Sequence, residues 1–151
     1  MPRGGWGKLA SLTLTSRWLA PGLPAERIDA LLVTAAAAVG RLPALNLLEL
    51  WNGGKGLACV FRYRAPSASA GAVPGASITW RATWNYGLEG RVVGGWEKVA
   101  YARRPDPLRV VVEGLDAASI QSHGDAIQQL SFSHNVAQPV SLEQIQKENR
   151  Y

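Results

Sequence analysis

Residues 47–63 read LLELWNGGKGLACVFRY, and this stretch decides the fold. Two runs of β-forming residues flank the segment 52–56, whose Asn and Gly residues are typical of a β-hairpin turn. Successive side chains of a strand point to opposite faces, so Phe61 and Tyr63 share one face and Arg62 lies on the other. The stretch therefore predicts a hairpin with one apolar face, half buried in a larger sheet.

The residues before the hairpin predict a strand and a helix. Residues 9–15 alternate between apolar and polar side chains, which is the pattern of a half-buried strand. Residues 25–42 carry apolar side chains at three- and four-residue spacing and predict an amphipathic helix. With the strand at 45–51, this part reads strand, helix, strand, and such a crossover joins parallel strands of one sheet.

The residues after the hairpin predict two further strands and a second long helix. Residues 65–76 are small and rich in Gly and Pro, so we expect an exposed, mobile loop there. Residues 77–84 alternate like a strand, and residues 92–103 have a helical apolar face. The Val-rich run 108–113 is the best candidate for a central strand.

Two short helices are predicted at the end of the chain. Asp116 is placed to cap a helix that carries Ile120, Ile127 and Leu130, with an interruption near Gly124. Residues 141–144 read SLEQ, which has the form of a capping box and predicts a terminal helix at 142–149.

These elements predict an α/β (mixed α+β) fold with the order β-α-β-β-β-α-β-α-α. We expect one domain over residues 1–151, built on a single mixed sheet of about five strands, with helices packed mainly on one face. The helices should cover the face that bears the rings of Phe61, Tyr63, Trp80 and Trp84. The opposite face should show to solvent or to a partner the side chains of Glu49, Arg62, Arg64, Thr79, Arg81 and Thr83.

Composition indicates a globular protein in a reducing compartment. The 151 residues carry a net charge of +5, which permits contact with acidic proteins, nucleic acid or anionic lipid. The single cysteine, Cys59, cannot close an internal disulfide and reads as a small buried hydrophobic residue. No signal peptide or membrane span is apparent, so we expect an intracellular protein with no membrane partner.

Candidate catalytic residues are few. The run Ser122-His123-Gly124-Asp125 holds the side-chain types of a hydrolase, but neighbouring residues on one turn point in different directions. A helix end whose polar side chains bond to the backbone explains the run better, and a small hydrolase around His123 remains the third hypothesis. One Cys and two His have no ligand spacing, so no metal and no cofactor are predicted.

Residues 55–62, KGLACVFR, partly match a motif of RNA-recognition domains. The mismatches fall at Leu57, Cys59 and Arg62, which are the positions where the motif has the aromatic rings on which bases stack. Because the helix at 25–42 needs an apolar surface, core aromatics are the favoured interpretation. A single-stranded RNA-binding domain with an aromatic sheet face is the second hypothesis.

Tryptophans near turns are the other candidates for contact with a partner. Trp6, Trp18 and Trp51 lie beside predicted turns, and two exposed tryptophans close together would mark an interaction patch.

Seven short motifs resemble those of a fungal family of uncharacterised proteins. They are LELWNGGKG at 48–56, CVFRY at 59–63, ITWR at 78–81, WEKVA at 96–100, LRVVVE at 108–113, SHGDAI at 122–127 and PVSL at 139–142. In that family a domain of unknown function follows an F-box-like segment, and the resemblance runs from about Leu9 onward. It implies the substrate-side module of a ubiquitin-ligase adaptor, without catalytic residues to transfer.

The chain departs from that family at its front, because no all-helical F-box fits before the strand at 9–15. We therefore expect a truncated gene product or a stand-alone remnant that keeps target recognition but not the ligase link. The leading hypothesis is a non-enzymatic interaction domain for a protein partner. Its predicted binding residues are Trp51, Arg62, Arg64 and Arg81.

Overall fold

The computed structural model describes residues 9–66, 75–88, 90–103 and 107–130. These residues form one five-stranded sheet in the spatial order β1-β2-β3-β4-β5, which is also their order along the chain. The strands are β1 (Ser11–Thr15), β2 (Leu47–Gly54), β3 (Leu57–Arg64), β4 (Ser77–Ala82) and β5 (Arg109–Gly114). The single mixed sheet predicted from the sequence is confirmed.

The predicted hairpin is the centre of the sheet. Strands β2 and β3 pair antiparallel from Leu47↔Arg64 to Gly54↔Leu57. Gly56 adopts a φ of 71° in the turn, a left-handed conformation that glycine reaches without a steric cost. β4 then pairs antiparallel with β3, while β1 and β5 pair parallel with β2 and β4.

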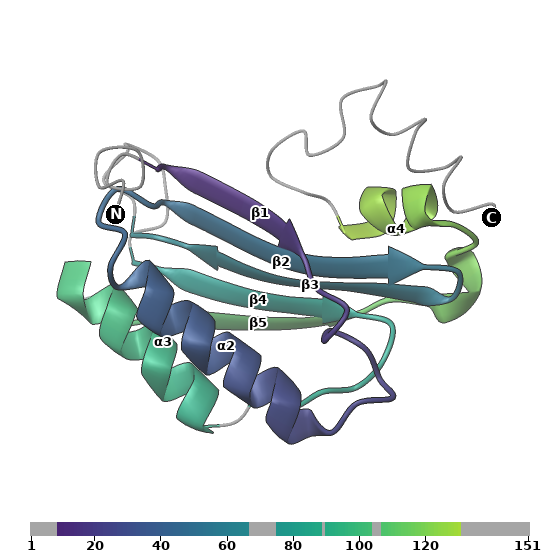
Figure 1. Cartoon of the computed structure of the whole chain (residues 1–151), viewed down its shortest axis with the longest axis horizontal. Coiled ribbons are helices and arrows are strands. Elements are labelled where there is room, and N and C mark those ends of the chain that lie inside the picture. The colour runs from purple at the N-terminus through teal and green to yellow at the C-terminus, as the bar shows by residue number, and fades with distance from the viewer. Residues whose placement is uncertain (1–8, 67–74, 89, 104–106, 131–151) are drawn as a thin grey trace.

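Two helices make the parallel connections, and both lie on the same face of the sheet (Figure 1). Helix α2 (Ala25–Val39) links β1 to β2, and helix α3 (Gly90–Arg103) links β4 to β5. The helices contact each other as well as the sheet. A 3₁₀ turn, η1 (Ala117–Ser119), and helix α4 (His123–Leu130) follow β5, and α4 packs on the opposite face over β2 and β3.

The main core lies between the sheet and the pair α2/α3. Phe61, Tyr63 and Trp80 are fully buried there, so the predicted orientation of the aromatic face is confirmed. Trp96 of α3 contacts two of these rings, with centroid separations of 5.2 Å to Phe61 and 4.8 Å to Tyr63. Such tilted ring contacts add to the stabilisation from burial. Trp84 is only half buried.

A second, smaller core lies beneath α4, and it corrects the prediction of an open charged face. Trp51 and Val60 on the sheet contact Ile120, Ala126 and Leu130, all of which are buried. The sequence suggested solvent on this side because its strands carry charged residues. The apolar stripe of α4 instead covers the part of the face that bears Trp51 and Val60.

The Val-rich run at 108–113 was predicted to be a central strand, and that prediction is wrong. β5 is the edge strand of the sheet, paired on one side to β4. Its β-branched residues suit any strand, and their apolar character does not say how many neighbours the strand has.

The remaining predictions concern the ends of elements. The break near the C-terminal helix falls at residues 120–122, not at Gly124, which lies inside α4. Most of the predicted loop at 65–76 and all of the predicted helix at 142–149 lie outside the described residues. Within the described ranges, no helix combines the length and apolar character needed to cross a lipid bilayer.

Candidate functional site

The four residues predicted to bind a partner divide into two buried and two more accessible ones. Trp51 is 4% exposed and Arg62 is 6% exposed, so the expectation that both lie on the surface is wrong. Arg64 is exposed at the end of β3, and Arg81 of β4 is partly exposed. A role of Arg64 or Arg81 in partner binding stays a prediction.

Arg62 is buried because an acidic side chain on the neighbouring strand neutralises it. Its Nε donates to Oε2 of the fully buried Glu49 over 2.6 Å, and Thr13 Oγ1 donates to Oε1 of the same carboxylate over 3.2 Å. Buried charges persist when they are paired and hydrogen-bonded. A substitution at Arg62 therefore reports on the fold, because it leaves Glu49 without its nearest cation.

Arg62 and Arg81 together hold the C-terminal end of α4 on the sheet. Arg62 Nη2 and Arg81 Nη1 both donate to the Leu130 carbonyl oxygen, over 3.1 and 3.0 Å. Carbonyls in the last turn of a helix lack intrahelical partners, and cations at that end are favoured by the helix dipole. Arg81 also pairs with Glu113 of β5. These arginines fix the position of α4.

The run at 122–125 forms the N-terminal cap of α4. Ser122 Oγ accepts the backbone N–H of Asp125 over 3.1 Å, and Asp125 Oδ2 accepts the backbone N–H of Gln121 over 3.0 Å. His123 is the first residue of the helix. The backbone therefore engages both the hydroxyl and the carboxylate that the hydrolase hypothesis requires.

The other sequence candidates are also enclosed. Cys59 is fully buried, and burial raises the pKa of its thiol well above the ordinary value of 9.0, so the thiol stays protonated at neutral pH. The rings of Phe61 and Trp80 lie beneath the helices, where a nucleic-acid base cannot stack on them. Among the described residues, no three potential ligands gather into a metal site.

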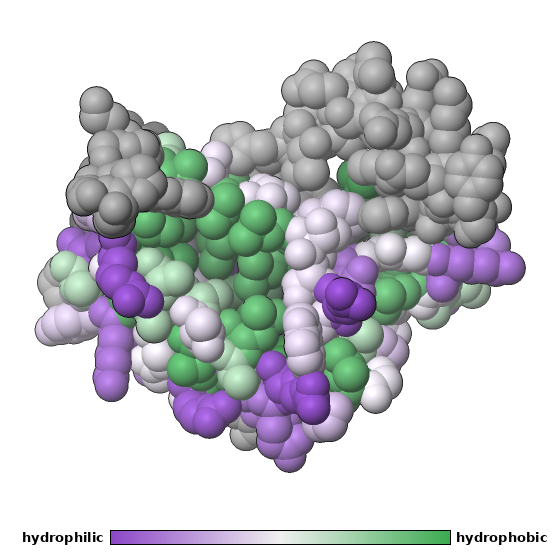
Figure 2. All heavy atoms as spheres, in the orientation of Figure 1, coloured by the Kyte–Doolittle hydropathy of each residue, from purple (hydrophilic) through white to green (hydrophobic). Residues whose placement is uncertain are grey.

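A surface groove lies instead between α2 and the segment that follows β1. The side chains of Trp18, Arg27, Ala30, Leu31 and Thr34 line a hollow of about 370 Å³. Figure 2 shows apolar side chains gathered between β1 and α2, with hydrophilic residues along the lower rim of the molecule. We call this hollow the Trp18 groove.

Trp18 stands at the rim because its neighbours are anchored. Ser16 Oγ accepts the N–H of Trp18 over 3.2 Å, so the chain turns as soon as β1 ends. Leu19 is fully buried, and its carbonyl oxygen accepts Asn52 Nδ2 over 3.1 Å. With both neighbours fixed, the Trp18 side chain is left 42% exposed.

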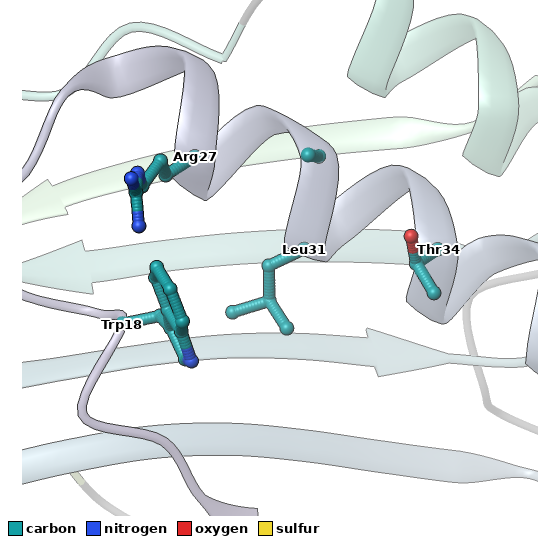
Figure 3. A pocket seen from close by; sticks show the side chains of 5 residues that line it. Trp18, Arg27, Leu31 and Thr34 are labelled. Carbon is teal, nitrogen blue, oxygen red and sulfur yellow. The ribbon is translucent and has the colours of Figure 1, made fainter.

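Helix α2 supplies the other wall of the groove. Arg27, Leu31 and Thr34 are four and three residues apart, which places them in one stripe on a helix. The Arg27 guanidinium carbon lies 5.0 Å from the centroid of the Trp18 ring, a cation–π arrangement (Figure 3). Leu31 and Thr34 continue along the helix from this pair (Figure 3). The groove is thus apolar along its length, with one cation at the Trp18 end.

The edge strand β1, which leads into the Trp18 segment, carries hydrogen-bonding groups that face away from the sheet. The Ala10 carbonyl and the Ser16 N–H both bond to the β2 side. A parallel ladder uses alternate residues, so the N–H and C=O groups of Ser11, Thr13 and Thr15 point outward. Leu14, which shares the α2 face of the sheet, is 47% exposed. The groove and the edge together form a surface that can take an extended chain.

Sequence reasoning found part of this surface. Trp18 was singled out as a tryptophan beside a turn, and its exposure is confirmed, whereas Trp51 is buried and Trp6 lies outside the described residues. Leu31 belonged to the apolar stripe of the predicted helix, which indicated only core packing. Arg27 carried no signal, because its contact with Trp18 depends on how the crossover returns along the sheet.

Comparison with known proteins gives a family and no activity. A family model described as "Family of unknown function (DUF6546)" matches residues 1–138. The chain matches no curated protein and no solved structure.

Proposed function

Because the chain belongs to the DUF6546 family, whose function is unknown, we propose from its surface that it is a non-enzymatic protein-interaction domain. Its partner is a protein segment that binds in extended form along β1. The observation that carries the proposal is the Trp18 groove, an apolar hollow between helix α2 and the segment that follows the edge strand β1. Addition of a peptide strand to a sheet edge is a recurring mode of protein recognition.

The edge and the groove have separate tasks in this mode. The outward N–H and C=O groups of Thr13 and Thr15 pair with the main chain of the peptide, which supplies affinity without reading its sequence. Alternate side chains of an added strand point toward α2 and enter the groove beside Trp18 and Leu31. The groove therefore selects apolar side chains at every second position.

Charge narrows the choice of peptide. Arg27 lies over the exposed Trp18 ring at one end of the groove, and the whole chain has a net charge of +5. An acidic residue beside the apolar positions of the peptide is favoured by both features, through a local contact and through faster encounter. The partner segment is thus apolar with an acidic flank.

The resemblance to fungal F-box-associated proteins supports a cellular setting for such a domain. In that setting the chain is an intracellular module that recognises a target protein, as the substrate-side part of an adaptor does. Target recognition by peptide capture needs no catalytic residue in this chain.

A selection from a random peptide library tests the proposal. Peptides are selected on the wild-type protein with counter-selection on the Trp18→Ala variant, and the affinities of enriched peptides are measured by calorimetry. We expect apolar peptides with acidic flanks, whose binding is weakened about tenfold or more by Trp18→Ala and by Arg27→Glu.

A matched pair of edge variants separates strand addition from simple burial in the groove. Thr15→Pro removes an outward N–H, whereas Thr15→Val keeps that N–H in a residue of similar shape. Peptide binding should be lost in the first variant and retained in the second. Binders that tolerate Trp18→Ala and Thr15→Pro alike, or a library that returns no binders, would contradict the proposal.

A further inference from the structure

The opposite edge of the sheet carries a second exposed surface. Val110 and Val112 of β5 are 41% and 60% exposed, and Tyr101 of α3 is exposed on the same side. The N–H groups of Arg109 and Leu115 bond to the β4 side, so the N–H and C=O groups of Val110 and Val112 point outward. We propose that β5 pairs antiparallel with β5 of a second copy of this chain.

In one register, the residues of β5 are complementary to those of a second β5 strand that runs antiparallel to it. Antiparallel pairing places outward-pointing residues opposite each other, so a two-fold axis must pass beside a residue of the strand. With the axis beside Val111, Arg109 faces Glu113 of the second copy and Val110 faces Val112. Moving the axis to Val110 or Val112 sets Arg109 and Glu113 opposite uncharged residues. Charge thus selects the register centred on Val111.

The charged side chains of Arg109 and Glu113 are available for this contact. The Arg109 side chain makes no hydrogen bond or ion pair with another described residue. Glu113 receives both bonds from Arg81 on the single atom Oε1. In the Val111 register, Arg109 and Glu113 form a pair that exchanges no backbone hydrogen bonds, where opposing side chains come closest. Each Glu113 then lies between Arg81 of its own chain and Arg109 of the second copy.

The pairing also removes apolar surface from water on the helix face. Val110 and Val112 of the two copies come together around the axis, which is perpendicular to the sheet and keeps both α3 helices on the same side. Tyr101 lines a hollow of about 610 Å³ together with residues that include Lys98 and Leu108, next to the start of β5. An edge strand with exposed valines and unpaired backbone groups is a template for pairing with another strand unless another part of the protein covers it.

The symmetry of the contact explains why a second copy, and not a longer assembly, is the occupant. Pairing β5 with itself is isologous and closes after two chains. Pairing β5 with β1 of another copy is head-to-tail and continues without end, and β1 carries no charges to match Arg109 and Glu113. The charge pattern therefore favours a closed dimer with one continuous sheet.

Sedimentation of the full chain with two charge variants tests the dimer. Arg109→Glu places like charges opposite each other at both ends of the contact, and Glu113→Arg does the same with the opposite sign. Each variant alone should dissociate with a Kd raised about tenfold or more, whereas their equimolar mixture should form a heterodimer in which both pairs attract. Circular dichroism confirms that each variant is folded.

Proline supplies a second, independent test. Val112→Pro removes an N–H that only the second copy uses, and edge strands tolerate proline when that N–H points outward. The matched variant Val112→Thr keeps the N–H. We expect monomers from the first and dimers from the second.

Each of four results would overturn the proposal, and the first three concern the wild type, the proline variant and the charge variants. They are a wild-type monomer at high concentration, a dimer that survives Val112→Pro, and charge variants whose mixture stays monomeric. A dimer abolished by Trp18→Ala instead of Val112→Pro would also overturn it, because the contact would then use the Trp18 groove. Peptide binding measured on the monomeric Val112→Pro variant tests the proposed function independently of the dimer.

Discussion

Two buried tyrosines differ in whether the hydroxyl has a partner. Tyr86 donates its hydroxyl hydrogen to Oδ1 of the buried Asp29, which ties the segment after β4 to helix α2. The hydroxyl of Tyr63 is enclosed in the main core and has no hydrogen-bond partner among the residues that the structure describes. A buried polar group without a partner is destabilising, whereas a bond to a charged group is among the stronger ones.

The matched substitutions Tyr86→Phe and Tyr63→Phe should therefore act in opposite directions. Tyr86→Phe leaves the Asp29 carboxylate without this donor and should lower the free energy of unfolding by about 1.5–3 kcal/mol. Tyr63→Phe keeps the ring contact with Trp96 and should leave stability unchanged or raise it by about 1 kcal/mol. Urea unfolding measures both, and an equal loss in the two variants would refute the argument.

The buried thiol of Cys59 and the buried hydroxyl of Tyr63 also determine how the free energy of unfolding depends on pH. Burial raises the pKa of the Cys59 thiol well above 9.0, and burial raises the pKa of Tyr63 above 10.0 although Arg103 acts in the opposite direction. The folded protein keeps these protons at a pH where the unfolded chain releases them. The resulting stability is complete below the unfolded pKa values and is lost as the pH rises through the raised ones.

We expect the free energy of unfolding to fall above about pH 9, by at most about 1.4 kcal/mol per pH unit for each group. Cys59→Ala removes the first of these titrations, so its stability should decline less steeply than that of the wild type between about pH 9 and about pH 10. Chemical unfolding at several pH values compares the slopes. Parallel curves would show that the thiol titrates normally in the folded protein.

At the scale of elements, α4 is an eight-residue helix whose position depends on groups outside it. Helices this short are marginal in isolation, so tertiary contacts must hold them. The buried stripe of Ala126, Ile127 and Leu130 supplies one contact, and the two arginines at the Leu130 carbonyl supply another.

Arg81→Ala should loosen α4 without unfolding the sheet. Loss of one charge-assisted hydrogen bond corresponds to about 1.5 kcal/mol, or about tenfold faster amide exchange through local opening of residues 123–130. Arg91→Ala at the start of α3 is the control, because the exposed Arg91 side chain makes no hydrogen bond or ion pair with a described residue. Equal protection of α4 in the two variants would mean that Arg81 does not hold the helix.

The placement of the long helices follows from the order of elements. Two hairpin reversals separate β2 from β4, so these strands run in the same direction. Both crossovers step across the sheet the same way, and right-handed connections then put α2 and α3 on one face. The sequence pattern contained this result. It could not place β5 at an edge, because three valines in a row look alike in a central and an edge strand.

At the scale of the whole molecule, the sequence predicted the features that follow from periodic patterns of side chains. It did not predict the features that depend on contacts between particular residues brought together by the fold. Strand alternation predicted the buried ring face of Phe61 and Trp80. Charge on the other face suggested solvent, because no periodicity reveals that Glu49 and Arg62 neutralise each other 13 residues apart. The Trp18 groove was missed for the same reason, since Trp18 and Arg27 meet only through the fold.

The positions of β1 and β5 at opposite edges have a consequence for avidity. Two copies joined at β5 hold their bound peptides at the two far ends of a continuous sheet, eleven strand spacings or about 53 Å apart at roughly 4.8 Å per spacing. A partner carrying two binding motifs can occupy both sites only if its linker reaches that far, which takes at least about 15 extended residues. Two-motif peptides with longer linkers should gain about tenfold or more over single motifs, and shorter ones should gain nothing. The dimer would thus select partners by the spacing between their two binding motifs.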